Sequence, residues 1–220
     1  MVEAVFIGTF VPMVLMLVLL RHSRPVIGCF CWGMAAFLLT HLLSPSLTTL
    51  LGTNEFGISA VFIGPALEEF LKPIPILLLA FIAVRSLVPF FYILGLAAGI
   101  GFAVEENVIY LIRFGLELEE GSRVLMVLRS FSTCLMHGVA TGLTGFFVTE
   151  ACRQPKSWSW MLVVMAWLVA LAYHGLFNWL MLEGHLAIGV LVAMAVFTAF
   201  LIAMKECEKR APETRGTMWE

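Results

Sequence analysis

Long apolar runs, separated by short polar stretches, divide this chain into segments of about the length that crosses a membrane. We expect seven spanning helices, over residues 2–20, 26–43, 59–84, 88–112, 124–149, 158–182 and 186–204. The stretches 44–57 and 113–123 are rich in turn-forming or charged residues and are expected to be loops. The pattern predicts an all-α fold, a polytopic membrane helix bundle.

Composition favours a membrane protein over a soluble domain. Of the 220 residues, 61% are hydrophobic and 13% are charged, whereas soluble domains are about half apolar. The 13 basic and 15 acidic residues form no basic stripe, so no nucleic acid is expected as a partner. The five cysteines are an odd number, and no disulfide framework is expected. Nothing marks a boundary within residues 1–205, which we expect to be one transmembrane domain followed by a charged cytoplasmic tail, 206–220.

Basic residues near the segment ends predict the orientation. Residues 2–20 are expected to span the membrane and not to be a cleaved signal peptide, because Glu3 lies in the run and no small-residue cleavage site follows it. One set of loops, with the tail, carries nine basic residues: Arg21, Arg24, Arg85, Arg153, Lys156, Lys205, Lys209, Arg210 and Arg215. The opposite loops carry only Arg113 and Arg123. The positive-inside rule then places the N-terminus outside and the C-terminus in the cytoplasm.

The third segment carries charges where lipid is expected. Glu68 and Glu69 precede Lys72 by four and three residues, so on a helix one ammonium can reach both carboxylates. A charge near the bilayer centre costs about 3 kcal/mol on insertion scales, which makes these residues candidates for a functional site. The alternative is a buried ion pair that only fixes helix packing. Three prolines are expected to kink or break this helix: Pro65, Pro73 and Pro75.

Polar residues recur in the next three segments. They are Glu105, Glu106 and Asn107 in the fourth, Arg129 and His137 in the fifth, and His174 and Asn178 in the sixth. Small residues on the same helices predict close contact with protein: Gly95, Gly99, Gly101, Gly138 and Gly142. The remaining histidines, His22, His41 and His185, lie near segment ends and are expected to be ordinary surface residues.

The candidate residues fall at compatible depths. At 1.5 Å per residue, Glu68, Glu69 and His137 lie near the midplane, and Glu106 and His174 in the outer half, so they can meet in one cavity. Two mechanisms of amide hydrolysis suit such a cavity. A glutamate and two histidines can bind a divalent metal such as zinc and leave a position for water. Alternatively, a buried glutamate takes a proton from water while histidine and asparagine donate to the oxyanion.

Four motifs in order carry a family resemblance: Glu68-Glu69-x-x-Lys72, Phe102-x-x-x-Glu106-Asn107, His137, and His174-x-x-x-Asn178. This set, within residues 64–178, resembles the PrsW family of intramembrane proteases, itself distantly similar to the CAAX prenyl endopeptidases and bacteriocin-immunity membrane proteins. The resemblance implies a bundle with active-site-bearing central helices. It also implies site-one cleavage of a single-pass membrane protein, such as an anti-sigma factor, near the extracytoplasmic side.

The resemblance implies residue roles as well. Glu68 or Glu69 would activate the water, and Lys72 would hold the second carboxylate. His137 and His174 would be metal ligands or oxyanion donors, Asn178 an oxyanion donor, and Asn107 part of the site through its motif. Glu106 stands where the CAAX enzymes have a histidine. It keeps a possible ligand, so the expected metal set is Glu106, His137 and His174 with zinc, but a glutamic mechanism without metal stays open.

Two other functions fit the same residues. A proton- or cation-coupled transporter also places glutamate, lysine and histidine within the membrane, although no inverted repeat is visible in the sequence. A non-catalytic scaffold or immunity protein is the third possibility. The substitution Glu69→Gln separates them, because a protease would lose cleavage, a transporter would lose flux and a scaffold would lose nothing.

Overall fold

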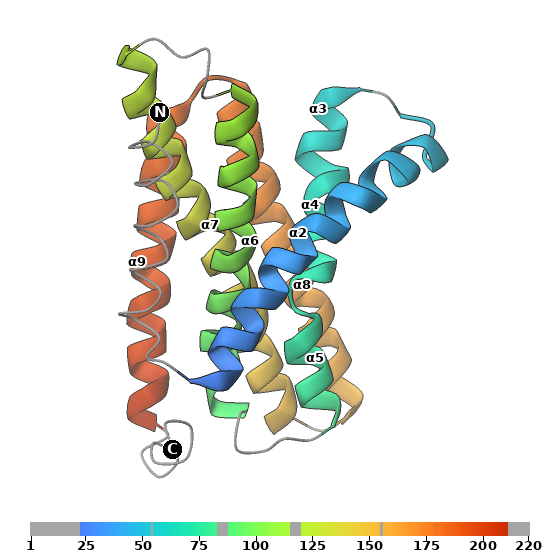
Figure 1. Ribbon diagram of the computed structural model, residues 1–220. Helices are drawn as coiled ribbons and strands as arrows, with labels where there is room; N and C mark the ends of the chain where they lie inside the picture. Colours follow the sequence, from blue (N-terminus) through green and yellow to red (C-terminus); the bar gives the residue numbers. More distant parts are fainter. Residues whose placement is uncertain (1–22, 54, 83–87, 115–119, 155, 211–220) are drawn as a thin grey trace.

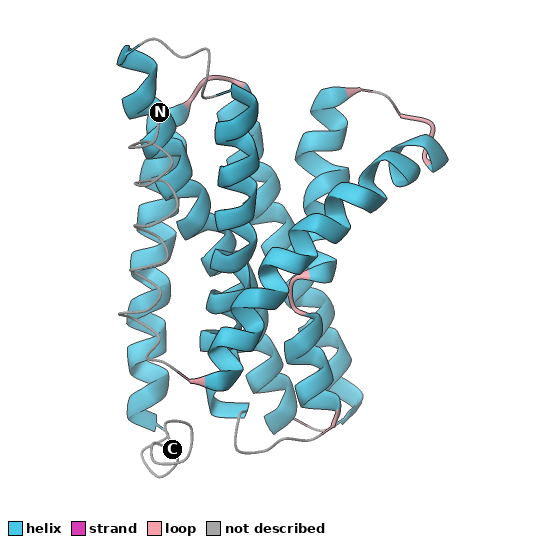
Figure 2. Ribbon diagram, viewed as in Figure 1, coloured by secondary structure: helices cyan, strands magenta, loops and turns pink. Residues whose placement is uncertain are grey.

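The computed structural model describes residues 23–53, 55–82, 88–114, 120–154 and 156–210, and it shows these residues as helices with short connections (Figures 1 and 2). The long helices are α2 (Arg24–Leu50), α6 (Phe91–Phe114), α7 (Glu120–Arg153), α8 (Lys156–Leu182) and α9 (Leu186–Arg210). The short ones are α3 (Phe56–Ile58), the π-helix η1 (Ser59–Ile63), α4 (Gly64–Leu71), α5 (Ile74–Phe81) and the 3-10 turn η2 (Val88–Phe90). The all-α class is confirmed for the described residues, which include no strand.

Helices α6 and α7 form the centre of the bundle, with α8 and α9 beside α7 and with α2 crossing α6 (Figure 1). In the most apolar 18-residue stretch of each helix, 78% of the residues are buried in α6 and 67% in α7, against 28% in α8 and 17% in α9. Large apolar side chains of the outer helices stay exposed, among them Met165, Leu191 and Ile202. This difference identifies α6 and α7 as the helices that contact protein on most sides.

Glycines allow α6 and α7 to touch backbone to backbone. A Cβ on Gly99 would lie 2.0 Å from the carbonyl oxygen of His137, and one on Gly95 would lie 2.3 Å from that of Thr141. The prediction that this glycine-rich face packs against protein is confirmed. The close approach also fixes the height of His137 relative to α6, because neither helix can shift without a backbone clash.

The third expected span is not one helix. Helix α4 ends at Leu71 and α5 begins at Ile74, so the chain breaks at Lys72 and Pro73, as the prolines predict. Each of these helices has eight residues, too few to cross a bilayer alone. Five described helices are long and apolar enough to do so: α2, α6, α7, α8 and α9. The expectation of seven spans is therefore not confirmed, and its first segment, 2–20, lies outside the described residues.

The first expected loop was partly wrong, because α2 continues to Leu50. Pro45 lies inside this helix, and the hydroxyl of Thr49 donates to the Pro45 carbonyl at 2.8 Å. Pro45 has no N–H to donate to the carbonyl of His41 one turn earlier, a cost that membrane helices tolerate, and α2 continues past it. The turn comes later, at Gly52, whose φ of +64° favours glycine.

The second expected loop, 113–123, is also shorter than the sequence suggests. Helix α6 extends through Phe114, and α7 already begins at Glu120. Acidic residues are favourable in the first turn of a helix, so the charged stretch that looks like a loop starts a helix instead.

Candidate functional site

Six of the candidate residues come together where four elements meet midway along the bundle. They are Glu68 and Glu69 of α4, Lys72 just after α4, Glu106 of α6, His137 of α7 and His174 of α8. The break after α4 allows Lys72 to end a short helix whose last turn points into the bundle. We call these six residues the polar cluster.

Glu69, Lys72 and His174 form its sealed part. The side chains of Glu69 and Lys72 are fully buried, and the ammonium donates to Oε1 of Glu69. Nδ1 of His174 lies 2.8 Å from the same oxygen and donates to it. The ring proton of His174 is thereby assigned to Nδ1, and Nε2 keeps its lone pair. Glu69 thus orients the imidazole of His174.

His137 lies between Lys72 and Glu106. Its Nδ1 is 2.9 Å from Nζ of Lys72, and its Nε2 is 2.8 Å from Oε2 of Glu106. Because an ammonium can only donate, Nδ1 accepts, and the ring proton on Nε2 is donated to Glu106. The ring also packs on Phe102 and stands edge-on to His174, with centroid distances of 4.9 and 4.6 Å. Glu106 therefore orients His137 as Glu69 orients His174.

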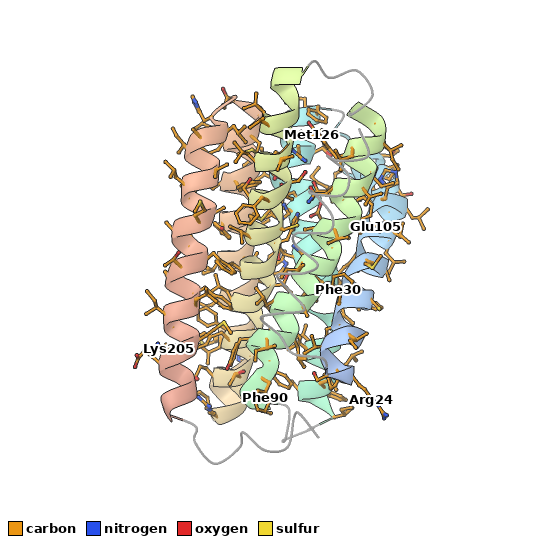
Figure 3. The ribbon with its side chains drawn as sticks, turned by 60° about the vertical axis from the view of Figure 1, so that its left-hand side comes forward. Arg24, Phe30, Phe90, Glu105, Met126 and Lys205 are labelled. Carbon is orange, nitrogen blue, oxygen red and sulfur yellow. The ribbon has the colours of Figure 1, made fainter. Side chains whose placement is uncertain are left out.

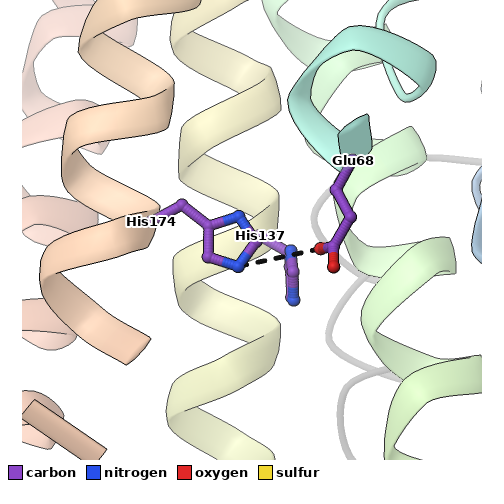
Figure 4. Close-up of side chains that lie close together, drawn as sticks. All are labelled: Glu68, His137 and His174. Atoms are coloured by element: carbon purple, nitrogen blue, oxygen red, sulfur yellow. Dashed lines mark ion pairs between the residues drawn. The ribbon is translucent and has the colours of Figure 1, made fainter. Parts of the chain in front are cut away.

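Glu68 is the carboxylate of the cluster that has no lysine or arginine within ion-pair distance in the described part of the chain. Its Oε2 lies 3.7 Å from Nε2 of His174 (Figure 4), and its side chain is 17% exposed. Glu68, His137 and His174 each offer one ligand atom, and these atoms lie within 4.8 Å of one another. One carboxylate oxygen and two imidazole nitrogens are a donor set found in catalytic zinc sites.

The metal ligands expected from the sequence were Glu106, His137 and His174. In the structure, the carboxylate grouped with the two histidines is Glu68. Glu106 accepts a hydrogen bond from Nε2 of His137, the protonated ring nitrogen. Glu68 lies beside the unprotonated Nε2 of His174. The sequence alone could not separate the two carboxylates, because both lie at depths from which they could reach the histidines.

Arg129 is a member of the site that the motifs do not include. Its Nη2 lies 3.6 Å from Oε1 of Glu106, and its Cζ lies 3.6 Å from the centroid of the Tyr110 ring. The only sequence signal was a charge within an apolar segment. The pair crosses from α7 to α6, so no fixed spacing along the chain reveals it.

The side-chain amides of the two asparagines of the motifs donate hydrogen bonds to backbone carbonyls. Asn107 donates from Nδ2 to the carbonyl of Ser130 at 3.0 Å and so ties α6 to α7. Asn178 donates from Nδ2 to the carbonyl of Ala60 at 2.9 Å and so ties α8 to the π-helix η1. Glu105, next to Glu106, is half-buried on the side of α6 away from α7 (Figure 3).

The family model described as PrsW family intramembrane metalloprotease matches residues 21–204 of this chain. The matched region includes the whole polar cluster, Arg129 and both asparagines. No curated protein and no solved structure matches the chain.

Proposed function

The chain belongs to the PrsW family of intramembrane metalloproteases, and we propose that it hydrolyses a peptide bond of a single-pass membrane protein with Glu68 as the group that takes a proton from water. The match and the five apolar helices make it a multi-pass membrane protein. The peptide-bond chemistry and the role of Glu68 rest on the pairing of charges in the polar cluster.

The observation that carries the proposal concerns the three carboxylates of the polar cluster. Among the described residues, no lysine or arginine lies within ion-pair distance of Glu68, whereas Glu69 and Glu106 each have one. Glu69 is held by Lys72, and Glu106 lies beside Arg129. Both paired carboxylates also accept a hydrogen bond from a histidine. Glu68 lies 3.7 Å from His174 and forms no ion pair with a lysine or arginine of the described residues. A carboxylate without such a pair is the better proton acceptor, since an ion pair would stabilise its ionised form.

In the metal-dependent alternative, Glu68, His137 and His174 would hold a divalent metal such as zinc, and Glu68 would be a ligand of the ion. Glu69 turns His174 so that Nε2 faces Glu68, the orientation that a metal-binding imidazole requires. His137 would contribute Nδ1 once its hydrogen bond with Lys72 opens, while its Nε2–H stays hydrogen-bonded to Glu106. When bound, the ion would polarise the scissile carbonyl group.

In the reaction without metal, the side chains carry out every step of the hydrolysis. Glu68 accepts a proton from water as the water oxygen forms a bond to the carbonyl carbon. The carbon–nitrogen bond then breaks, and Glu68 returns the proton to the leaving amine. Glu68 and Glu106 are 17% and 28% exposed, so water and substrate approach from their side. Glu69 and Lys72 are sealed on the other side.

Asn178 remains our candidate for oxyanion stabilisation. One N–H of its side-chain amide donates to Ala60, and an amide nitrogen carries a second. We assign that second N–H to the oxyanion, so that a single residue fixes η1 and contributes to the site. Asn107 acts indirectly on the site, because its hydrogen bond holds α7 against α6.

The substrate that fits is a single-pass membrane protein of the anti-sigma-factor type, cut on the extracytoplasmic side. Arg24 and Lys205 lie toward the same end of the bundle, and Glu105 lies in the opposite half (Figure 3). With the basic end in the cytoplasm, the N-terminus is outside and the tail 206–220 inside. Residues 1–205 act as one catalytic domain in this proposal.

The test compares new protein N-termini in membranes from cells that express the wild type, Glu68→Gln or Glu105→Gln. Glu105→Gln is the matched control, because it removes the neighbouring intramembrane carboxylate outside the polar cluster. We expect N-termini at the edge of a single-pass segment with the wild type and the control but not with Glu68→Gln. Three identical profiles, with equal amounts of folded protein, would contradict the proposal and make proton-coupled transport the next function to measure.

A further inference from the structure

Arg129 is a charged side chain beside the polar cluster that no motif and no step above uses. We propose that Arg129 is a positioning residue, which holds Glu106 so that Glu106 keeps the imidazole of His137 in one orientation. The inference rests on the proposed function, since it assigns Arg129 to the same reaction.

The geometry divides the two oxygens of Glu106 between two partners. Oε1 lies 3.6 Å from Nη2 of Arg129, and Oε2 accepts a hydrogen bond from His137 Nε2 at 2.8 Å. A carboxylate held at one oxygen by a guanidinium cannot rotate away from the imidazole at the other. The tautomer of His137, with its proton on Nε2 and its lone pair on Nδ1, then follows from the position of Glu106.

Tyr110 holds the guanidinium in place. The Cζ of Arg129 lies 3.6 Å from the ring centroid, within the range of a cation–π contact. Tyr110 stands one helical turn after Glu106 on α6, so the two residues meet Arg129 together from one helix. Arginine suits this role better than lysine because its planar group can stack on a ring and face a carboxylate at once.

The arrangement is a costly one for stability alone. Nη1 of Arg129 is buried without a hydrogen-bond partner among the described residues, although the side chain as a whole is 22% exposed. A charged donor left without an acceptor in a membrane helix is unfavourable. An arginine that served only to pack α7 against α6 would gain by turning toward water. Its position over Tyr110 and beside Glu106 points to a role in the site.

The polar cluster contains two arrangements in which a cation holds a carboxylate and the carboxylate orients a histidine. Lys72 holds Glu69, and Glu69 orients His174; Arg129 holds Glu106, and Glu106 orients His137. Each imidazole is thus aimed by a carboxylate that a cation fixes. In these two arrangements, Nε2 of His174 and Nδ1 of His137 are the ring nitrogens without a proton.

The experiment uses the full-length protein in proteoliposomes with the substrate found by the N-terminus comparison, and the variants Arg129→Met, Arg129→Lys and Arg113→Met. Arg113 is the matched control, because it pairs with His41 at 3.2 Å and contacts no residue of the polar cluster. We expect Arg129→Met to lower kcat about 10- to 100-fold per folded molecule with KM little changed. Arg129→Lys should lose less, and Arg113→Met should match the wild type.

A second readout does not depend on activity. Nitrogen-15 NMR of histidine-labelled protein reports the tautomer of His137, identified by its loss in His137→Gln. The wild type and Arg113→Met should show one tautomer, and Arg129→Met should show a mixture. Wild-type kcat and a single tautomer in folded Arg129→Met would overturn the inference. Absence of cleavage by the wild type itself would instead overturn the proposed function, and the NMR result would still decide the role of Arg129.

Discussion

Two histidines of this protein are oriented in the same way, but one arrangement is local in the sequence and the other is not. Glu69 and Lys72 are three residues apart at the end of α4, and their side chains are fully buried. Glu106 and Arg129 come from different helices, and their side chains are 28% and 22% exposed. The first pair is therefore a tight unit that folds with its own turn. The second exists only when α6 and α7 pack correctly.

Glu68 stands outside both pairs, and its substitution should have the largest effect on activity. Glu68→Gln removes the proton acceptor and should lower kcat by about 10²- to 10⁴-fold. Its thermal stability in detergent should stay near that of the wild type, because no cation loses its partner. Equal losses of stability in Glu68→Gln and Glu69→Gln would show that Glu68 is part of a structural pair after all.

Lys72→Met should give the largest loss of stability, because it leaves Glu69 buried without a cation. Removing one partner of a buried pair costs about 3–5 kcal/mol. Unfolding titrations of the purified protein measure this loss. The double variant Glu69→Gln/Lys72→Met should recover much of the stability but not the activity, since His174 then lacks its orienting carboxylate. Additive losses in the double variant would argue against the pair.

Gly99→Ala separates the two arrangements. Its Cβ would lie 2.0 Å from the carbonyl oxygen of His137, so α6 and α7 must move apart at the level of that histidine. We expect a cost of about 1–3 kcal/mol in unfolding free energy. The second arrangement should be disturbed and the first spared, which the tautomers of His137 and His174 report. Gly28→Ala, with nothing within 4 Å of its added Cβ, is the control.

Arg129→Met should have the smallest effect on stability, about 1 kcal/mol or less, because a partly exposed pair is screened by water. It should nevertheless lower kcat, as proposed above. This combination, a stable protein with a slow reaction, is the reverse of what a packing residue would give. The same unfolding titration checks it beside Lys72→Met, and a loss as large as that of Lys72→Met would contradict the comparison.

Local relations along the chain were predictable from the sequence. The spacing of Glu69 and Lys72 predicted their pairing, the prolines predicted the break at Pro73, and the glycine-rich face predicted the contact of α6 with protein. Each of these depends on residues within a few positions of one another. Helical geometry alone converts such spacings into contacts.

Relations between helices were harder to predict. Which of Glu68 and Glu106 lies beside both imidazoles depends on the rotation of α4 after the π-helix η1. That rotation is fixed in part by Asn178, 118 residues away from Ala60. The loop expected over 44–57 failed for a different reason. A membrane helix tolerates a proline within it, so Pro45 did not end α2.

The most direct test of Glu68 as the group that activates water is isotope incorporation. Purified wild type and Glu68→Gln would be reconstituted with the substrate in water enriched in oxygen-18. The N-terminal cleavage product, which carries the newly formed carboxyl group, would be analysed by mass spectrometry. We expect one oxygen-18 in the new carboxyl group with the wild type and almost no labelled product with Glu68→Gln. Labelled product at the wild-type rate from Glu68→Gln would contradict this expectation.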